Sequence, residues 1–541
     1  MPSQSLHPAV KSYAEEYERG LIGRREFLAR ATALGVTTAA AYGAIGLSQP
    51  ALAQTAPRKG GTLRISMETR PVTDPRSWDN LEIANFARGW LDWLTVHARD
   101  GSVQGSLCES WEVNDTADQY TLHLRKSVTW TNGDAFTAED VMHNFVRWGD
   151  QTEPTNSMPS RIASLIDPET KKLRDGAVEI VDEHTLILRP HTSDITLMAA
   201  VTDYPAAIVH RSYQGEDIVQ NPIGTGAYRP IVNEVSQRQI LERIPDREYW
   251  RPGGWLDRIE FIDYGTEQTN IVAAAEAGDI DLTFRTDAEF VALMDRLGWQ
   301  RSEMPTASTI VVRFNQNNAP YDNRDVRRAL QMAVDNNVLL TLGIDGQGIP
   351  AENHHVCPLH PEYAELPPIV PDPAGALDLL KSTGHADTEF ELVSIDSEWQ
   401  SNTCDAVAAQ LRDAGIKVKR TVLPSSTYWN SWLEFPFSAT EWGPRPLGVQ
   451  ILALAYLSNA AWNESAFRNA EFDELLTQAM SIADTDKRRE IMARIQKLMQ
   501  DEGVIIQPFW RSAINHSNGK LVNADVHQFF LINVHDIYFK E

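Results

Sequence analysis

A six-residue stretch, Glu441-Trp442-Gly443-Pro444-Arg445-Pro446, combines an indole ring with a cation three residues later. A tryptophan ring can cover an apolar or planar group, and a guanidinium can form a bidentate pair with a carboxylate. Glycine and proline hold the backbone between the two side chains. The stretch therefore predicts one wall of a binding pocket, with Trp442, Gly443 and Arg445 as contacts and Glu441 beside them. The alternative is a surface turn with a buried tryptophan and a solvated arginine.

A second group of reactive side chains lies in a proline-rich loop and consists of His354, His355, Cys357 and His360. Their spacing matches none of the usual zinc patterns, and the surrounding prolines leave the geometry undefined. We therefore predict no metal ion and no cofactor. A receptor for nickel or a metal chelate remains an alternative.

The cysteines and the missing catalytic motifs limit the chemistry further. Cys108, Cys357 and Cys404 lie far apart, so the simplest expectation is three isolated core side chains, with one bridge between two of them left open. The chain has no Gly-x-Ser-x-Gly, His-Glu-x-x-His or Walker sequence. We predict no catalytic residues and no enzymatic activity. An exported hydrolase is the alternative from another functional class.

Length and charge bound the possible partners. The chain has 541 residues and a formal net charge of −25. It is too long for a single hydrophobic core, so two or three domains are expected. Nucleic acid is excluded as a partner because no basic patch would offset phosphate repulsion. In so acidic a protein an anionic ligand would need a local cation, which draws attention to an arginine in a cleft.

Residues 1–53 have the layout of an export signal. Residues 23–28, GRREFL, resemble a twin-arginine motif, a weakly apolar run covers 31–47, and Ala51-Leu52-Ala53 supplies a small-x-small cleavage pattern. The apolar run is too short and too mild to span a membrane. No cysteine stands at the cleavage point, so no lipid anchor is expected. We predict a free periplasmic protein that is exported in folded form. The alternative is an amphipathic helix that happens to carry two arginines.

Helix and strand patterns alternate along the rest of the chain, which favours α/β lobes. Thr137 has Asp140 in capping-box spacing, and a helix over 270–277 should end at Gly278. A helix is also expected over 83–96. Alternating polar and apolar residues predict strands over 110–113, 120–124, 178–181 and 185–188.

Four motifs, taken in order, resemble those of family-5 extracellular solute-binding proteins, the peptide, opine and nickel receptors of ATP-driven importers. They are LRKSVTWTNGDAFTAEDV at 124–141, NPIGTGAY at 221–228, APYDNRDVRRAL at 319–330 followed by AVD at 333–335, and NAEFDELL at 469–476. Each motif is weak alone, but four in the family's order are specific. The second also packs two glycines and a proline into what we expect to be a tight crossing of chain segments.

The resemblance implies an α/β, two-lobed periplasmic-binding-protein fold (type II, cluster C-like), with two crossing strands between the lobes and an extra α/β subdomain. It places lobe one at 54–95, 221–310 and 506–541, the extra subdomain at 96–220, and lobe two at 311–505. It further implies capture of a small molecule or peptide as the lobes close, and delivery to ABC permease subunits in the inner membrane, without chemistry. We expect a monomer.

The chain departs from this family beside Trp442. The family's peptide receptors usually carry an aspartate three residues after the equivalent tryptophan, where it pairs with the α-ammonium group of the ligand. Here the position is Arg445. A guanidinium repels an ammonium and attracts a carboxylate, so we predict a peptide-like or opine-like solute that bears a carboxylate. A general di- or oligopeptide receptor is the alternative, and Glu441 could instead neutralise Arg445.

Further candidate contacts follow from position in the family's pattern or from aromatic character: Trp78, Asp79, Asn80, Leu81, Arg161, Tyr428 and Trp432. The first four fall in the loop after the first strand, where the family contacts ligand. Asp79 could bind a ligand ammonium group in place of the missing aspartate, or it could cap the following helix. Arg161 falls where the extra subdomain reaches the cleft. Tyr428 and Trp432 have helical spacing, which is more typical of a core, but they precede Trp442 closely.

Overall fold

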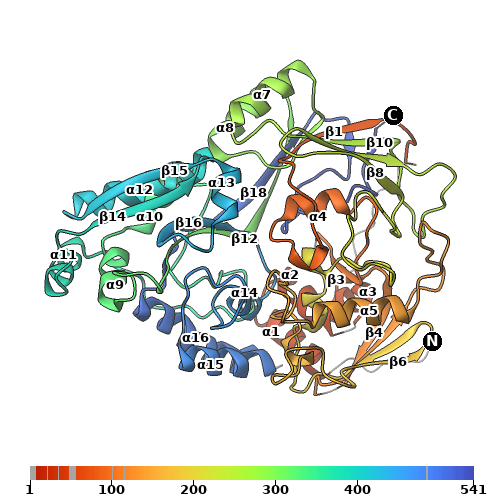
Figure 1. The fold of residues 1–541 in the computed structure, drawn as a ribbon, viewed down its shortest axis with the longest axis horizontal. Helices are drawn as coiled ribbons and strands as arrows, with labels where there is room; N and C mark the ends of the chain where they lie inside the picture. Colours follow the sequence, from red (N-terminus) through yellow and green to blue (C-terminus); the bar gives the residue numbers. More distant parts are fainter. Residues whose placement is uncertain are drawn as a thin grey trace.

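Two strands, β12 (Gln300–Phe314) and β18 (Phe509–Ser517), run through the middle of the molecule (Figure 1). The computed structural model describes residues 8–20, 22–34, 36–47, 57–99, 102–114, 116–482 and 485–540. The two strands pair antiparallel, with a register shift between Pro305 and Ser308. Beyond the shift, β12 also pairs with β16 (Phe437–Trp442). Because a bulge bends and twists a strand locally, β12 can pass at this point from one half of the molecule into the other.

In the described part of the chain these strands belong to one 12-stranded mixed sheet, in the order β15-β14-β16-β12-β18-β11-β1-β10-β9-β8, with β13 paired to β18 and β17 to β12. We call the parts on either side of β12 and β18 the β1 side and the β14 side. The other strands of this sheet are β1 (Thr62–Ser66), β8 (Tyr228–Glu234), β9 (Arg238–Arg243), β10 (Arg258–Ile262), β11 (Leu282–Thr283), β13 (Gly348–Pro350), β14 (Glu389–Ile395), β15 (Lys417–Leu423) and β17 (Ile505–Ile506).

The β1 side also carries a smaller antiparallel sheet of order β4-β5-β7-β6. Its strands are β4 (Cys108–Val113), β5 (Tyr120–Leu124), β6 (Val178–Asp182) and β7 (Thr185–Leu188), which confirms the four strands predicted from alternation. The predicted capping box is also present at the start of α5 (Ala138–Trp148), where the Thr137 backbone N–H donates to the Asp140 carboxylate over 2.9 Å. Two short pairs complete the sheets: β2 (Thr95–His97) with β3 (Val103–Gly105), and β19 (Leu521–Val522) with β20 (Tyr538–Phe539).

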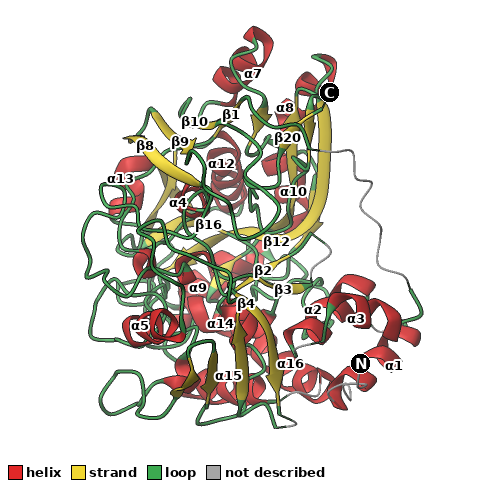
Figure 2. Cartoon of the chain, turned by 90° about the vertical axis from the view of Figure 1, so that its right-hand side faces the viewer, coloured by secondary structure: helices red, strands yellow, loops and turns green. Residues whose placement is uncertain are grey.

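Helices cover the sheets on both sides (Figures 1 and 2). On the β1 side they are α4 (Leu81–Ala87), α5, α6 (Leu197–Ala200), α7 (Gln268–Ala277) and α8 (Ala288–Arg296), with 3-10 turns η1 (Pro75–Ser77), η2 (Ala163–Leu165) and η3 (Tyr204–Ala206). On the β14 side they are α9 (Arg324–Met332), α10 (Asn336–Ile344), α11 (Pro373–Ser382), α12 (Glu398–Asp413), α13 (Ser425–Asn430), α14 (Gly448–Ala455), α15 (Ala470–Ser481) and α16 (Thr485–Glu502). As predicted, α7 ends at Gly278, whose φ of 76° is left-handed. The expected domain boundaries stay predictions.

The helix expected over 83–96 is wrong in its extent, because α4 ends at Ala87 and β2 begins at Thr95. The cause is the close approach of the segment around Gly224 and Gly226. A Cβ atom on Gly224 would lie 1.8 Å from the carbonyl oxygen of Trp90, and one on Gly226 would lie 2.4 Å from that of Gly89. The backbone after α4 therefore leaves the helical path to pack against this segment, which is the tight crossing expected from its glycines.

The core contains the three cysteines as isolated side chains. Cys108, Cys357 and Cys404 are buried and free, so no bridge joins any two of them. Burial raises the pKa of both the Cys108 and the Cys404 thiol to about 12. These thiols therefore stay protonated and act as small apolar side chains.

The amino-terminal segment forms three helices, α1 (Pro8–Glu18), α2 (Arg24–Ala33) and α3 (Thr38–Ala44). They share a small core of buried side chains that includes Tyr13, Phe27, Leu28 and Tyr42. The segment thus has folded structure, which the expectation of a separate export signal did not include. The expected cleavage site at Ala51–Ala53 lies outside the described residues. Within the described residues, no helix has both the length and the apolar character needed to cross a membrane.

Candidate functional site

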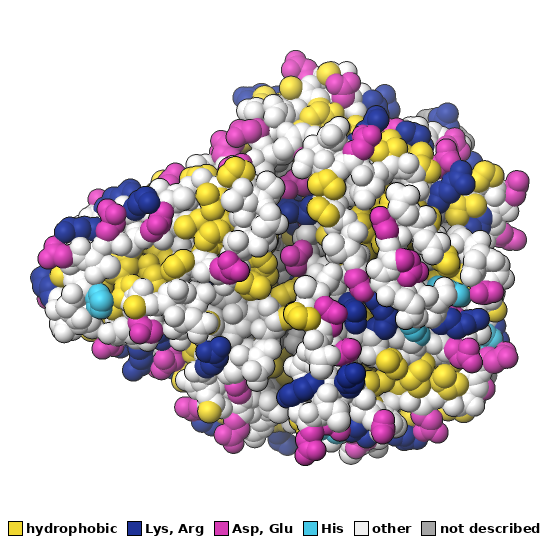
Figure 3. All heavy atoms as spheres, in the orientation of Figure 1, with side chains coloured by type: hydrophobic (Ala, Val, Ile, Leu, Met, Phe, Trp, Pro, Cys, Tyr) yellow, Lys and Arg dark blue, Asp and Glu magenta, His cyan; other side chains and the backbone are white. Residues whose placement is uncertain are grey.

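A pocket lies between the β1 side and the β14 side, beside β12 and β18. It contains about 1050 Å³ of space free of protein atoms, open to solvent, which suits a small solute. Figure 3 shows a hollow between the two halves of this face, with acidic and basic side chains inside it. The β1 side contributes residues 66–68, 70, 79–82, 284, 285 and 287, among others, and the β14 side contributes residues 395, 397, 399, 400, 429, 441 and 443.

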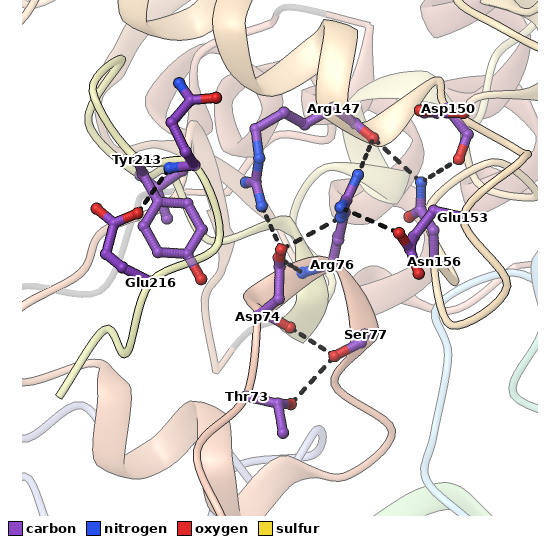
Figure 4. A network of polar contacts seen from close by, with 12 residues as sticks. Thr73, Asp74, Arg76, Ser77, Arg147, Asp150, Glu153, Asn156, Tyr213 and Glu216 are labelled. Carbon is purple, nitrogen blue, oxygen red and sulfur yellow. Dashed lines mark hydrogen bonds and ion pairs between the residues drawn. The ribbon is translucent and has the colours of Figure 1, made fainter.

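The loop that carries Asp79 into the pocket is held in place by a polar network (Figure 4). Arg76 lies between Asp74 and Glu153, at 3.3 Å and 3.7 Å, and Arg147 from the end of α5 pairs with the same Asp74. The fully buried Trp78 donates its indole N–H to the carbonyl of Thr73 over 2.9 Å. The loop is therefore tied to the end of α5 and to the segment after it before it reaches the pocket.

The four residues predicted in this loop divide between support and lining. Trp78 is a buried anchor and does not line the pocket, whereas Asp79, Asn80 and Leu81 do. Asn80 caps α4, because its Oδ1 accepts from the backbone N–H of Ile83 over 3.2 Å. Since Asn80 holds the cap position, the idea that Asp79 caps this helix is wrong, and the Asp79 carboxylate lies at the pocket.

Charges of both signs line the pocket, but the acids outnumber the bases. Its lining contains two arginines, Arg70 and Arg285, and both are already paired: Arg70 with Glu68 at 2.9 Å, and Arg285 with Glu441. A third arginine, Arg511 on β18, lies behind the wall. It pairs with Asp287 at 3.2 Å and with Glu441 at 3.4 Å. The lining holds five carboxylates, Glu68, Asp79, Glu82, Asp287 and Glu441.

Two of these carboxylates, Asp79 and Glu82, form no ion pair within 4 Å in the described part of the chain. Asp79 accepts a hydrogen bond from the side chain of Asn80 over 2.9 Å. Burial raises the pKa of Asp79, and the nearby Arg70 opposes that rise. Five carboxylates against three arginines leave a formal surplus of two negative charges, and Asp79 and Glu82 carry it. The pocket therefore favours a cationic group.

Arg445 lies behind the pocket wall and is matched by an internal acid. It is 5% exposed and its Nε lies 3.2 Å from Asp203, which also accepts from Arg161 Nε over 2.7 Å. Although burial alone would raise it, Arg161 and Arg445 hold the pKa of Asp203 below its ordinary value. Arg161 is buried in this cluster, at 3% exposure, and lies outside the pocket lining. Glu441 pairs with Arg285 and Arg511, so the suggestion that it neutralises Arg445 is wrong.

The aromatic candidates of the β14 side lie behind the pocket wall. Trp442 donates its indole N–H to Glu464 over 2.7 Å, and Tyr428 donates its hydroxyl to the carbonyl of Ala439 over 2.6 Å. Trp432 packs edge-on against Trp442, with 6.3 Å between the ring centres. All three are buried and absent from the lining, whereas their neighbour Trp429 is part of it. The helical spacing of Tyr428 and Trp432 indicated this core position.

Some lining residues were not selected from the sequence: Glu68, Arg70, Glu82, Tyr204, Tyr264, Arg285, Asp287 and Trp399. Glu82 had a usable signal, since it stands three residues after Asp79 at the start of α4 and can face the same way. Arg285 and Asp287 follow the two-residue strand β11, and nothing local marks them as pocket residues.

The side chains of the proline-rich loop bond to neighbouring protein groups. His355 Nδ1 lies 2.7 Å from the hydroxyl of Tyr456, and His360 Nε2 lies 3.1 Å from the carbonyl of Arg445. Burial lowers the pKa of His360 to about 4. Across the ranges described, no three histidine, cysteine, aspartate or glutamate side chains are grouped so that they could hold a metal ion.

The comparison with known families agrees with this architecture. The model of "Bacterial extracellular solute-binding proteins, family 5 Middle" matches residues 102–464, which is more than half of the chain. The chain belongs to this family. The fold is the expected two-lobed α/β periplasmic-binding-protein fold, which confirms the prediction of fold and family. Members of this family are solute-binding proteins that work with ABC permeases.

Individual relatives are distant. The periplasmic oligopeptide-binding protein OppA of Haemophilus influenzae is 24% identical over 491 residues, covering 84% of this chain and 87% of its own. The structure of the Escherichia coli murein tripeptide binding protein MppA superposes with a TM-score of 0.81 at 20% identity, covering 90% of this chain and 100% of its own. The binding protein AgaA of A. tumefaciens R10, in complex with agropinic acid, has a TM-score of 0.78 at 19% identity, with 89% and 99% covered.

Proposed function

We propose that this protein is the periplasmic substrate-binding component of an ABC importer, and that it captures a peptide-like or opine-like solute carrying a cationic group. The observation that supports the cation is the surplus of two unpaired carboxylates, Asp79 and Glu82, in a pocket whose arginines are already paired. Relatives named for oligopeptide and murein tripeptide binding, and one bound to agropinic acid, support the solute class.

The electrostatic argument concerns desolvation as well as charge. A carboxylate in a half-buried pocket loses part of its hydration, and a ligand ammonium or guanidinium group restores the favourable interaction through charge-assisted hydrogen bonds. Asp79 and Glu82 both line the pocket, on either side of the first residue of α4, and we propose that one cationic group contacts both. Arg70 and Arg285 stay with Glu68 and Glu441 in this arrangement.

The carboxylate predicted on the solute has less support. That prediction relied on Arg445, and Asp203 already provides the counter-charge of this buried arginine. A ligand carboxylate would instead have to compete with Glu441 for Arg285 at the pocket. A zwitterionic solute is compatible with the surplus carboxylates and with a carboxylate on the ligand. Its cationic group would lie at Asp79 and Glu82, and its carboxylate would compete for Arg285.

Calorimetry with a matched pair of ligands tests the proposal. Trialanine should bind, and its N-acetylated form, which lacks the ammonium group, should bind at least about 30-fold more weakly, because losing one partner of a desolvated charge pair costs about 2–5 kcal/mol. Asp79→Asn and Glu82→Gln should each weaken trialanine binding. Glu139→Gln, which removes a charge at a 72% exposed site on α5, should leave it unchanged.

Two results would count against the proposal. Equal affinity for the free and acetylated peptides would mean that the surplus carboxylates do not recognise a cation. Conversion of a bound ligand into another compound would favour the exported hydrolase. For the location, we propose that residues 1–53 direct twin-arginine export, which fractionation of cells expressing Arg24→Lys together with Arg25→Lys would test through loss of the periplasmic protein.

A further inference from the structure

The helices α1–α3 are docked on the body of the protein at a boundary between the β1 side and the β14 side (Figures 1 and 2). A pocket with about 400 Å³ of space free of protein atoms, partly open to solvent, lies under them. Tyr13 and Arg30 line it from the amino-terminal helices, His97 from the β1 side, and Leu447 and Arg488 from the β14 side. Three parts of the chain therefore meet around one pocket.

The contact with the β1 side is a buried hydrogen bond. The backbone N–H of Val103 in β3 donates to Oγ1 of Thr32 over 2.7 Å, and this hydroxyl donates in turn to the carbonyl of Leu28 over 2.6 Å. Thr32 is fully buried and Val103 is 3% exposed. If α2 moved away from β3, the Val103 amide would exchange this buried hydrogen bond for one to water, and the packing of α2 on β3 would be lost.

The contact with the β14 side is made by Arg30. Its Nη2 donates to the carbonyl of Pro361 over 3.1 Å, and its side chain is only 3% exposed. Two acids of the same segment hold it in place: Glu16 at 2.8 Å and Glu26 four residues before it. The guanidinium is therefore fixed within the amino-terminal helices while it binds the other half of the molecule.

We propose that α1–α3 act as an intramolecular strap, which joins the β1 side to the β14 side and restricts the hinge motion between them until this segment is removed. This goes beyond the proposed function, because it concerns the motion of the full chain and holds for any ligand. Domain closure in binding proteins changes the distance between the two sides, so a segment bonded to both opposes it. Removal of residues 1–53 would release the restraint.

Hydrogen exchange of the full chain tests the docking. Arg30→Ala removes the bond to Pro361, and we expect exchange in segments 102–107 and 445–448 to accelerate about tenfold or more, since local opening would become easier. The matched control is Arg19→Ala, which removes an exposed arginine of the same segment and should change nothing. If exchange in β12 also rises, the body itself is affected. Thr32→Val then serves, because between α2 and the body it removes only the acceptor for Val103, and its other hydroxyl bonds lie within α2. Unchanged protection of segment 102–107 in Thr32→Val would overturn the docking.

The restriction of motion needs a distance measurement. Spin labels at Glu112→Cys on the β1 side and Asp378→Cys on the β14 side occupy sites 66% and 75% exposed, and the native cysteines are buried. In the labelled full chain we expect one narrow distance distribution, and in the same chain with Arg30→Ala a broader one with a second population. Identical distributions would overturn the strap, whatever the outcome of the ligand experiments.

Discussion

Asp203 accepts hydrogen bonds or ion pairs from two guanidinium groups, those of Arg161 and Arg445, and all three side chains are buried. The group has a formal surplus of one positive charge. Tyr204 partly compensates, because its ring lies 5.1 Å from the Arg445 guanidinium and its hydroxyl lies 3.3 Å from the same group. Since Tyr204 also lines the pocket, this cluster supports the wall from behind.

The balance of charges predicts which substitution in this cluster is the more damaging. Asp203→Asn leaves two buried guanidinium groups without a counter-charge and should lower the free energy of unfolding by about 3–5 kcal/mol. Arg445→Met leaves a balanced Arg161–Asp203 pair and should cost less, about 1–3 kcal/mol. Urea unfolding at pH 7 measures both, with Glu179→Gln at a 52% exposed site as the control. The reverse ranking would show that Asp203 is not the counter-charge of both arginines.

At the scale of elements, α2 carries a titratable group at its contact with the β14 side. Glu26 faces Arg30 on its own helix, and Glu362 and Arg489 on the body. Burial raises the pKa of Glu26 to about 7, Arg30 and Arg489 oppose the rise, and Glu362 adds to it. Docking of α2 therefore takes up a proton at neutral pH.

The sign of the pH effect follows from this raised pKa. The stabilisation from protonated Glu26 is complete below its ordinary value of 4.5 and is lost as the pH rises through about 7. After correction for intrinsic exchange rates, segment 102–107 should thus be better protected at pH 6 than at pH 8. Glu26→Gln, which is neutral throughout, should remove the difference. A pH dependence that persists in Glu26→Gln would assign the effect to another group.

Local rules predicted the elements whose ends are set by nearby residues. The capping box of Thr137 and Asp140 and the left-handed Gly278 depend on atoms within a few residues, and both are present. The alternating strands of the small sheet were found for the same reason. The end of α4 was missed because its cause, the close packing of Gly224 and Gly226, comes from a distant part of the chain.

The candidate site shows the same contrast between positions set by nearby residues and positions set by distant parts of the chain. Asp79 was predicted from its place after the first strand, and it lines the pocket. The position of Arg445 depended on Asp203, which stands 242 residues earlier and carries no local signal of its role. A charged side chain in a cleft can be chosen from sequence, but whether its charge is free depends on partners that only the fold brings near.

At the scale of the whole molecule, ion pairs of Glu441 at the pocket join the two sides across β12 and β18. Glu441 on β16 pairs with Arg285, which follows β11, and with Arg511 on β18. The pair thus joins the β14 side to the β1 side and stabilises this arrangement of the two without a ligand.

Removing this pair should loosen the molecule. In a chain labelled at residues 112 and 378, Glu441→Gln should add a population with a longer distance, because Arg285 loses its charged partner across the interface. Glu303→Gln is the matched control, since Glu303 pairs with Arg301 of its own strand β12. An unchanged distribution in Glu441→Gln would mean that the ion pairs of Glu441 do not set the arrangement of the two sides.

The strand order also has a consequence for biosynthesis. Strand β11 pairs with β1 on one edge and with β18 on the other, and β18 ends at Ser517. Because a ribosome delivers the amino-terminal part of a chain first, β11 emerges long before its second neighbour exists. During that interval its free edge can pair with other nascent chains or be covered by a chaperone. The β1 side is therefore completed only near the end of translation, whereas β14, β15 and β16 can assemble earlier.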